Sequence, residues 1–196
     1  MNPREINTTF EITTASMNQH IALAKSNVRA NRPALLYVHF EIEGDRVHVV
    51  TTDGRMQLHT ETMATSGVTE KPLAFDVRAM PRISAKEATT NDDGSSALFA
   101  VQDGLIISGD IVARITVDVG YPNWRNIIPG HAYLERETAW RILDPKYYAI
   151  AQKFAGRNAI RRPWCVPGLT DGPVVFREEL EEGEINTAVV MPFREG

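Results

Sequence analysis

Hydrophobic and polar positions along this chain follow one order of elements three times: a strand, a helix and three further strands. In the first unit, residues 8–14 alternate like a strand, and Ser16 with Gln19 has the spacing of a capping box at a helix start. Four apolar residues then recur at helical spacing: Met17, Ile21, Ala24 and Val28. Asn31 and Pro33 are expected to end this helix.

Alternating strands and polar turns fill the rest of the first two units. We expect strands at residues 35–42, 47–52, 56–63, 72–75, 97–101, 105–108 and 112–119. The turns that would connect them lie at residues 43–45, 53–54, 91–94 and 102–104. A short helical piece is expected around residues 77–87, although Pro81 weakens it.

The third unit contains a well-marked helix. A strand at residues 139–143 precedes Asp144, a good N-cap, and Pro145 occupies the first helical position. Gly156 is expected to end the helix, whose apolar face would be Tyr147, Ile150, Ala151 and Phe154. The strands that complete the unit are expected at residues 160–166, 174–178 and 186–193. Because the three units share little residue-level similarity, the repeat is inferred from the order of elements alone.

The composition is that of a folded protein. Hydrophobic residues make up 43% of the chain and charged residues 23%, which argues against disorder. No run approaches the roughly 18 apolar residues of a membrane helix, and no apolar stretch near the N-terminus suggests a secretory signal. Cys165 is the one cysteine, so an internal disulfide and a thiolate metal cluster are excluded. We expect a cytoplasmic protein.

Charge is distributed unevenly, although the net charge is only −4. Residues 17–33, 77–90 and 144–162 together hold 11 basic and 2 acidic residues, while the rest of the chain holds 10 basic and 23 acidic residues. A basic surface on an acidic body suits sequence-independent, salt-sensitive contact with phosphates. The candidates for contact with DNA are Lys25, Arg29, Arg32, Arg78, Arg82, Lys86, Lys146, Lys153, Arg157, Arg161 and Arg162. A solvated helix face is the alternative explanation for any one of these rows.

Three short segments add specific information: VTTDGR at residues 50–55, YPNWRNIIP at 121–129 and AVVMPFR at 188–194. In this order they resemble the bacterial sliding clamp family, the beta subunit of the replicative DNA polymerase, where the equivalents read like ATDGHRL, FPDYRRVLP and VVMPMRL. Taken alone, the Thr-Asp-Gly tripeptide would indicate only a tight turn. The resemblance spans nearly the whole chain.

The resemblance implies an α+β sliding-clamp fold built from repeated β-α-β-β-β half-units, with helices on the inner face and antiparallel sheets outside. Residues 1–131 would form a complete domain from half-units 1–68 and 69–131, and residues 132–196 would form a half domain. A clamp encircles double-stranded DNA and serves as a processivity factor for polymerases. It has no catalytic activity and needs no cofactor, and a separate clamp loader would be its partner.

In the clamp family, these segments line a hydrophobic pocket that captures a short peptide from a polymerase or repair protein. Carried over by motif, the pocket residues here are Leu35, Thr52, Gly54, Arg55, Pro122, Ile127, Val189, Val190, Met191, Pro192, Phe193 and Arg194. Leucine and phenylalanine anchors of a partner would fit such an apolar groove.

The chain departs from the family pattern in four places. The sequence RMQL at residues 55–58 stands where His-Arg-Leu is usual, so either Met56 and Gln57 replace pocket residues or the strand register is shifted by one. Asn126 stands where an arginine is common, and the chain continues past Arg194. The chain is also only about half the usual length of the family.

Assembly is predicted from the number of half-units. Rings of this family contain twelve, so three per chain predict a homo-tetramer in which the third unit docks on a partner chain. An isolated half-unit leaves a sheet face and a helix face unburied, which disfavours a monomer. A dimer made by pairing third units is the alternative. The contact residues expected there are Trp140, Tyr147, Tyr148 and Trp164.

Two other functions remain open. A module of clamp ancestry that never closes a ring could act as an adaptor or decoy that binds polymerase peptides. A metal-dependent hydrolase would use Asp53 and the histidines His20, His39, His48 and His59, but no HxH or HxxxH spacing and no bracketing carboxylate pair supports it. We therefore expect neither a metal site nor an enzyme.

Overall fold

The computed structural model describes residues 8–29, 33–68, 73–79, 89–91, 94–109, 111–117, 121, 123–128, 135–136, 143–161, 163–165, 172–180 and 183–192. Its elements are β1 (Thr8–Thr13), α1 (Thr14–Ser26), η2 (Asn27–Arg29), η3 (Pro33–Leu36), β2 (Tyr37–Thr52), β3 (Met56–Val68), β4 (Leu73–Asp76), η4 (Val77–Ala79), β5 (Thr89–Asn91), β6 (Gly94–Gln102), β7 (Leu105–Ser108), β8 (Ile111–Val117), η5 (Trp124–Asn126), β9 (Glu135–Arg136), α2 (Pro145–Arg161), β10 (Trp164–Cys165), β11 (Val174–Glu179) and β12 (Ile185–Val190).

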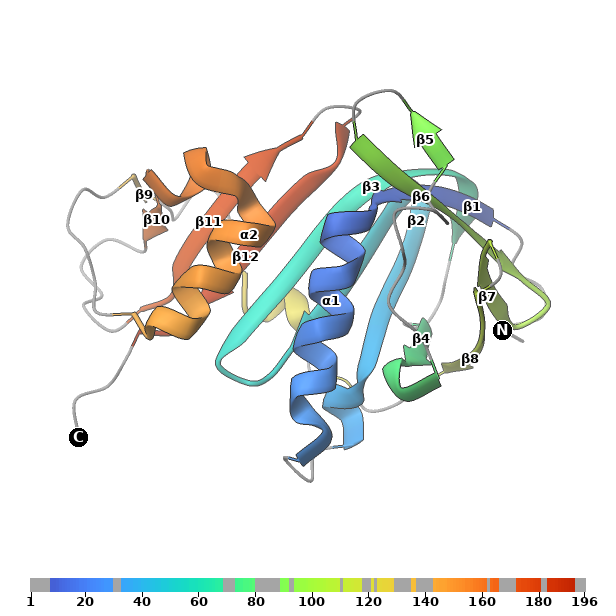
Figure 1. Ribbon diagram of the computed structural model, residues 1–196, viewed down its shortest axis with the longest axis horizontal. Helices are drawn as coiled ribbons and strands as arrows, with labels where there is room; N and C mark the ends of the chain where they lie inside the picture. Colours follow the sequence, from blue (N-terminus) through green and yellow to red (C-terminus); the bar gives the residue numbers. More distant parts are fainter. Residues whose placement is uncertain are drawn as a thin grey trace.

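Antiparallel strands form a continuous sheet with the order β1-β6-β7-β8-β4-β2-β3-β12-β11-β10-β9, and β5 lies beside β6 (Figure 1). Phe10 of β1 also pairs with Ala64 of β3, so the first seven strands of this order curl around a core of their own. Large side chains from the strands and α1 fill that core: Phe10, Phe40, Phe75, Phe99, Met17 and Ile21.

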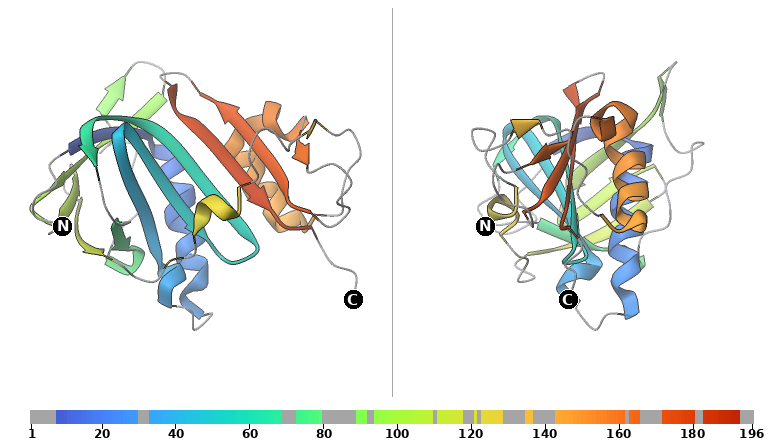
Figure 2. Two further views of the ribbon diagram at one scale, coloured as in Figure 1. Left: turned by 180° about the vertical axis from the view of Figure 1, so that it is seen from behind. Right: turned by 90° about the vertical axis from the view of Figure 1, so that its left-hand side faces the viewer.

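A second core lies under α2, where β3 joins the third unit of the chain. Residues 56–61 of β3 pair with all of β12, from Val190 opposite Met56 to Ile185 opposite Glu61. We call this pairing the seam. Both α-helices lie on the same side of the sheet across the seam (Figures 1 and 2). The edge of His20 on α1 meets Phe154 on α2 at 5.1 Å between ring centroids.

The first helix begins and ends earlier than the sequence pattern predicts. Its N-cap is Thr13, whose hydroxyl accepts a hydrogen bond from the Ser16 backbone N–H at 3.3 Å, so Ser16 lies inside the helix. The C-cap is Asn27, and Asn31 lies outside the described residues. Thr13, rather than Ser16, caps the helix because Thr13 is the last residue of β1, where the extended backbone ends.

A turn was predicted at residues 43–45, and this prediction is wrong. β2 is one strand through these positions, with a shift of register between Gly44 and Arg46 where it pairs with β3. A bulge therefore replaces the turn, and Gly44 accommodates it with a φ of 67°. The hairpin at residues 102–104 is confirmed, because Gln102 pairs with Leu105 across it.

The third unit agrees with the sequence at its helix start. Asp144 caps α2 by accepting a hydrogen bond from the Lys146 N–H at 2.8 Å. Gly156 interrupts the helix with a φ of 80°, but helical structure resumes up to Arg161, so the strand predicted from residue 160 is wrong and begins only at Trp164. Most of the strand predicted at residues 139–143 lies outside the described residues, as does the helical piece after Ala79.

Candidate functional site

The turn between β2 and β3 has its backbone fixed by its own side chains. The Asp53 carboxylate accepts hydrogen bonds from the backbone N–H groups of Arg55 and Met56, each at 2.9 Å. The Thr52 hydroxyl accepts from the Gly54 N–H at 3.0 Å and donates to the Met56 carbonyl. Gly54 has a φ of 88°, a left-handed conformation that strongly favours glycine. The Thr-Asp-Gly segment therefore presents a rigid turn at one end of the seam.

Two other parts of the chain are attached to this turn. The Met191 N–H donates to the Arg55 carbonyl at 3.0 Å, which fixes the segment that follows β12. The Asn27 amide donates to the carbonyls of Leu35 and Thr52, at 3.0 and 3.1 Å. One buried amide thus ties the end of α1 to both η3 and the end of β2. The structure brings these separated sequence segments together.

Side chains alternate across the seam, and this decides which of them line the candidate peptide site. Met56 and Val190 point toward α2 and belong to the core beneath it. Val189 points the opposite way and packs with Val175, and Ile127 packs against this pair. Ile128 and Trp164 complete this small outer cluster. The outer cluster is the apolar part of the candidate site, whereas Val190 is a core residue.

Gln57 lies on the same outer side, directly opposite Val189 in the seam. It is buried, and its amide N–H donates to the Trp124 carbonyl at 3.4 Å. Its amide oxygen is also buried and accepts no hydrogen bond within the described part of the chain. The strand register thus places Gln57, rather than Met56, beside the candidate site.

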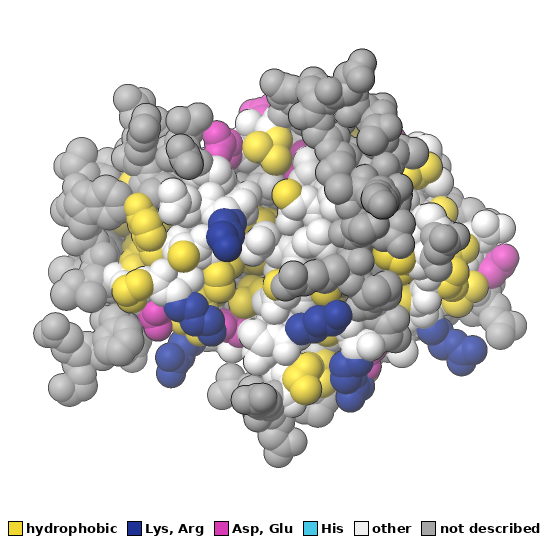
Figure 3. Space-filling view, in the orientation of Figure 1, with side chains coloured by type: hydrophobic (Ala, Val, Ile, Leu, Met, Phe, Trp, Pro, Cys, Tyr) yellow, Lys and Arg dark blue, Asp and Glu magenta, His cyan; other side chains and the backbone are white. Residues whose placement is uncertain are grey.

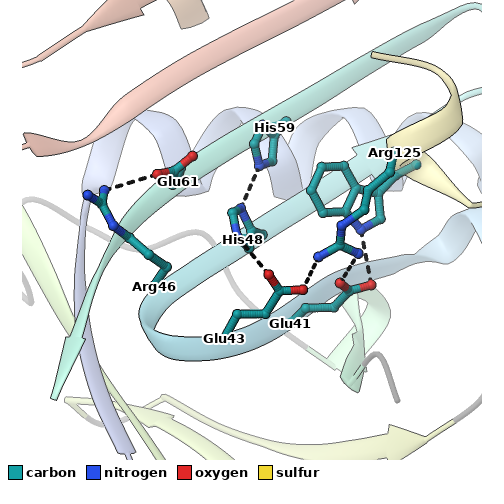
Figure 4. A network of polar contacts seen from close by, with 8 residues as sticks. Glu41, Glu43, Arg46, His48, His59, Glu61 and Arg125 are labelled. Atoms are coloured by element: carbon teal, nitrogen blue, oxygen red, sulfur yellow. Dashed lines mark hydrogen bonds and ion pairs between the residues drawn. The ribbon is translucent and has the colours of Figure 1, made fainter. Parts of the chain in front are cut away.

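The chain around η5 crosses the sheet on the side away from the helices, and Trp124 anchors it there (Figure 2). The indole stacks on His59 at 4.7 Å between centroids and donates to the Glu41 carboxylate at 3.0 Å. The Arg125 guanidinium lies 4.3 Å above the Trp124 ring and forms ion pairs with Glu41 and Glu43 (Figure 4). These contacts hold the second of the three motif segments next to the seam.

A histidine pair lies behind Trp124. Nδ1 of His48 and Nε2 of His59 are 3.1 Å apart and share a hydrogen bond (Figure 4). Burial lowers the pKa of both rings, and for His59 the nearby His48 lowers it further. Both are therefore neutral at pH 7. No group of three or more histidine, cysteine or acidic side chains in the described residues could hold a metal ion.

The second helix is also connected to the turn. Burial raises the pKa of the Tyr147 hydroxyl to about 12, and a hydrogen bond that the hydroxyl donates to the Asp53 carboxylate raises it as well. Tyr147 packs in the core under α2, and the Lys146 ammonium lies 5.0 Å from its ring centroid. The Asp53 carboxylate thus accepts hydrogen bonds both from the turn and from Tyr147 of α2.

The described lysines of both helices lie on the helix-bearing face. Lys146 and Lys153 are exposed on α2, and Lys25 is half-buried on α1. Figure 3 shows this face with several separate Lys and Arg side chains across its lower part. Arg78 is exposed in η4, where its guanidinium donates to Asp76 at 3.0 Å and so lowers the pKa of that carboxyl.

The remaining candidates cannot be placed in this geometry. Pro122, Phe193, Arg194, Arg32, Arg82, Lys86 and Arg162 lie outside the described residues. The side chains of Arg29, Arg157 and Arg161 also lie outside the described part, although their backbones belong to η2 and α2.

Sequence reasoning missed three residues that organise this region: Asn27, Trp124 and Glu184. The sequence pattern placed Asn27 inside a longer helix. Trp124 was noted only as part of the YPNWRNIIP motif, without a structural role. The neighbouring tryptophan and arginine between two asparagines were the available signal for an anchored crossing. Glu184 is 4% exposed and its carboxylate accepts from the Thr13 N–H at 2.7 Å. No local pattern marks it, because its partners Thr13 and Ser16 lie more than 160 positions away.

Comparison with solved structures decides the fold. A sliding clamp from Bacillus subtilis superposes with a TM-score of 0.61 at 12% identity, over 96% of this chain and 64% of that one. The DNA polymerase III beta subunit of Thermotoga maritima gives 0.58 at 13%, over 100% and 68%. A DnaN sliding clamp from Bartonella birtlesii, bound to griselimycin, gives 0.58 at 11%, over 95% and 66%.

This chain has the sliding-clamp fold. It spans about two thirds of the length of the solved clamps that it matches. No family model and no curated protein matches the sequence. The α+β clamp fold expected from the three motifs is thus confirmed. In the described residues, no helix of this clamp fold has the length and apolar character of a membrane span.

Proposed function

We propose that this protein is a small sliding clamp, a processivity factor that encircles duplex DNA as an oligomer and tethers polymerase-type partners through a peptide site. It would act by topology and surface contacts, with no catalytic step and no cofactor. A clamp loader would be a separate protein. Clamp function in this chain would take place in the cytoplasm, where replication proteins work.

The observation that carries this proposal is the seam. It continues one sheet from the first part of the chain into the third unit and keeps α1 and α2 side by side on one face. A ring segment needs this arrangement, because every added unit must extend the same wall and turn its helix to the same side. Lys25, Lys146 and Lys153 then supply loose phosphate contacts that permit sliding.

The outer cluster at the end of the seam supports peptide capture. Ile127 and Ile128 are partly exposed where they pack over the buried Val189, and Met191, two residues further along, is 40% exposed. Arg55 and the partly buried Pro192 lie at the rim. An extended peptide with leucine or phenylalanine anchors fits this combination.

Assembly into a tetramer is part of the proposal. Among the described strands, the sheet order ends at β9, a two-residue strand of the third unit. An unpaired sheet edge is a natural place for a further strand from another chain. Four chains would supply the twelve half-units of a closed ring, while a dimer would leave it open.

The test combines native mass with retention on DNA. A tetramer that stays on closed circular DNA but slides off the ends of linear DNA would support encirclement. Equal retention on both forms would refute it. A monomer or dimer that still binds a leucine- and phenylalanine-bearing peptide would indicate the alternative, an adaptor or decoy that does not close a ring.

A further inference from the structure

A groove with a volume of about 310 Å³ opens at the other end of the seam, far along β3 from the Thr-Asp-Gly turn. It arises because β3 changes partners there. β3 pairs with β12 up to Glu61, and three residues later Ala64 pairs with Phe10 of β1. β12 and β1 are therefore successive partners of β3, and we call the groove between them the fork groove. Leu98 of β6 also lines it.

Hydrogen bonds hold the walls of this fork groove in place. The Thr62 hydroxyl donates to the Glu11 carbonyl at 2.7 Å. The Thr65 hydroxyl accepts from the Thr9 N–H at 3.1 Å and shares a hydrogen bond with the Thr8 hydroxyl at 3.2 Å. A groove fixed by such bonds costs a ligand little ordering energy on binding.

Two large apolar side chains line the fork groove and face solvent. Met63 is 43% exposed and Leu98 is 46% exposed. Leu98 lies opposite Glu11 in the pairing of β1 with β6, so apolar and acidic groups are neighbours on this surface. Methionine adapts its shape to a bound side chain, which makes this pair a suitable apolar contact.

Within the described part of the chain, the charge of the groove has one sign. Of the described lining residues, Glu11 and Glu184 are ionisable, and none is a lysine or an arginine. The Glu184 carboxylate is held rigidly, because it accepts from the Ser16 hydroxyl at 2.7 Å and from the Asn186 amide at 3.1 Å. Glu11 is exposed at the rim. A basic group beside the groove would therefore be attracted, and an acidic one repelled.

We propose that the fork groove docks a short peptide segment of a partner protein that carries apolar side chains next to lysine or arginine. The apolar side chains contact Met63 and Leu98, and the basic group faces Glu11. This interaction is separate from the clamp function and from the outer cluster, because it lies at the opposite end of the seam and requires no ring.

The test uses a defined probe, the fluorescent peptide acetyl-Leu-Lys-Leu-Lys-Leu-amide, with acetyl-Leu-Glu-Leu-Glu-Leu-amide as its matched control. Fluorescence anisotropy with the full chain should show saturable binding of the lysine peptide and binding at least about fivefold weaker for the glutamate peptide. Equal affinities, or no saturable binding, would overturn the proposal.

Variants locate the binding. Leu98→Lys and Met63→Lys should each weaken the lysine peptide about tenfold, because they remove apolar contact and add a like charge. Val112→Lys is the matched control, since Val112 is 54% exposed and does not line the groove. An equal loss in Val112→Lys would show non-specific attraction and overturn the proposal. The proposal would also be overturned if the native chain formed a dimer that Leu98→Lys dissociates, because the groove would then bind a second copy of the chain.

A measurement on the unmodified chain keeps the proposal testable if a variant fails to fold. With carbon-13-labelled methionine methyl groups, the lysine peptide should shift the NMR signal of Met63 and leave that of Met191 unchanged. Met191 lies at the far end of the seam and has a similar exposure of 40%. A shift of Met191 without one of Met63 would contradict the fork groove as the binding site.

Discussion

At the residue scale, His20 shows how the molecule joins its parts. The ring lies at the contact between α1, the sheet and α2 and is fully buried. Its Nδ1 lies 2.9 Å from the Thr51 hydroxyl and its Nε2 3.0 Å from the Thr60 hydroxyl. Because a neutral imidazole donates from one nitrogen and accepts at the other, both threonines have a compatible partner.

Acid should destabilise the fold through this residue. Burial lowers the pKa of His20 to about 3, while the unfolded chain titrates near 6.5. Above pH 6.5 the ring is neutral in both states, so its full stabilisation is present there. Below that pH, the unfolded state takes up a proton that the folded state refuses, and the free energy of unfolding falls by up to about 1.4 kcal/mol per pH unit.

Urea unfolding of the native chain and of His20→Gln, in a series from about pH 7 to about pH 5, would measure this effect. His20→Gln should be less stable than the native chain near pH 7, but its free energy of unfolding should fall more slowly as the pH is lowered. His39 has a pKa lowered to about 3 as well, so part of the slope should remain. Identical slopes in the two proteins would contradict the assignment to His20.

Met191 is the residue on which peptide capture is best tested. Met191→Ala should weaken binding of a peptide with leucine and phenylalanine anchors by about tenfold and leave thermal stability unchanged, because the side chain is largely exposed. Titration by fluorescence anisotropy would measure the affinity. Val112→Ala is the control, since it truncates a 54% exposed apolar side chain that belongs neither to the outer cluster nor to the fork groove. Equal losses in both variants would count against the outer cluster.

At the scale of elements, Glu184 fastens the third unit to the first helix. Its carboxylate, just before β12, accepts hydrogen bonds from the backbone N–H and the hydroxyl of Thr13, the N-cap of α1. A negative charge near a helix N-terminus is favourable, and here it comes from a residue of another unit. The cap therefore couples formation of α1 to docking of β12 on β3.

Removal of this carboxylate should loosen both elements. Glu184→Ala leaves buried donors without a partner, so the free energy of unfolding should drop by about 2–4 kcal/mol. Glu179→Ala is the control, because Glu179 is exposed at the end of β11, and its loss should cost less than about 0.5 kcal/mol. Urea unfolding followed by circular dichroism measures both. A loss no larger than that of the control would refute the coupling.

At the scale of the whole molecule, the two sides of the sheet carry different charged groups. The helix side carries Lys146 and Lys153, and the outer side carries the ion pairs of Arg125 and Arg46. Because the seam keeps the two sheet portions continuous, each side is one surface across both units. The proposed clamp function therefore assigns phosphate contact and peptide capture to opposite sides of the sheet.

Charge reversal on the helix side should weaken retention on circular DNA. Lys146→Glu with Lys153→Glu removes phosphate contacts and should raise the rate of loss about tenfold or more at low salt. Arg46→Glu with Arg177→Glu makes the same change of charge on strands whose side chains at these positions point to the outer side. A gel-filtration assay on nicked circles would compare them. Equal losses of DNA retention in the two double variants would show that retention depends on net charge alone and not on the helix side.

Much of the local structure follows from residues close together in sequence. The cap at Asp144, the hairpin at residues 102–104 and the Thr-Asp-Gly turn each depend on neighbours within four positions, and each is confirmed. The start of α1 and the path of β2 through Gly44 were wrongly predicted. The last residue of β1 supplies the cap of α1, and β2 follows the pairing demanded by β3. Neither influence is visible in a local pattern.

The sequence by itself determined the alternation of strands and helices, the rigid turn and the three motifs that point to a clamp, because these depend on backbone preferences and short spacings. Only the tertiary structure decided that Gln57 faces the candidate site while Met56 and Val190 face the core. It also decided that Glu184 caps a distant helix and that β3 forks between two partners. Such outcomes depend on strand register and on contacts between residues far apart in the chain, and one shift of register would turn every side chain of the seam to the other face.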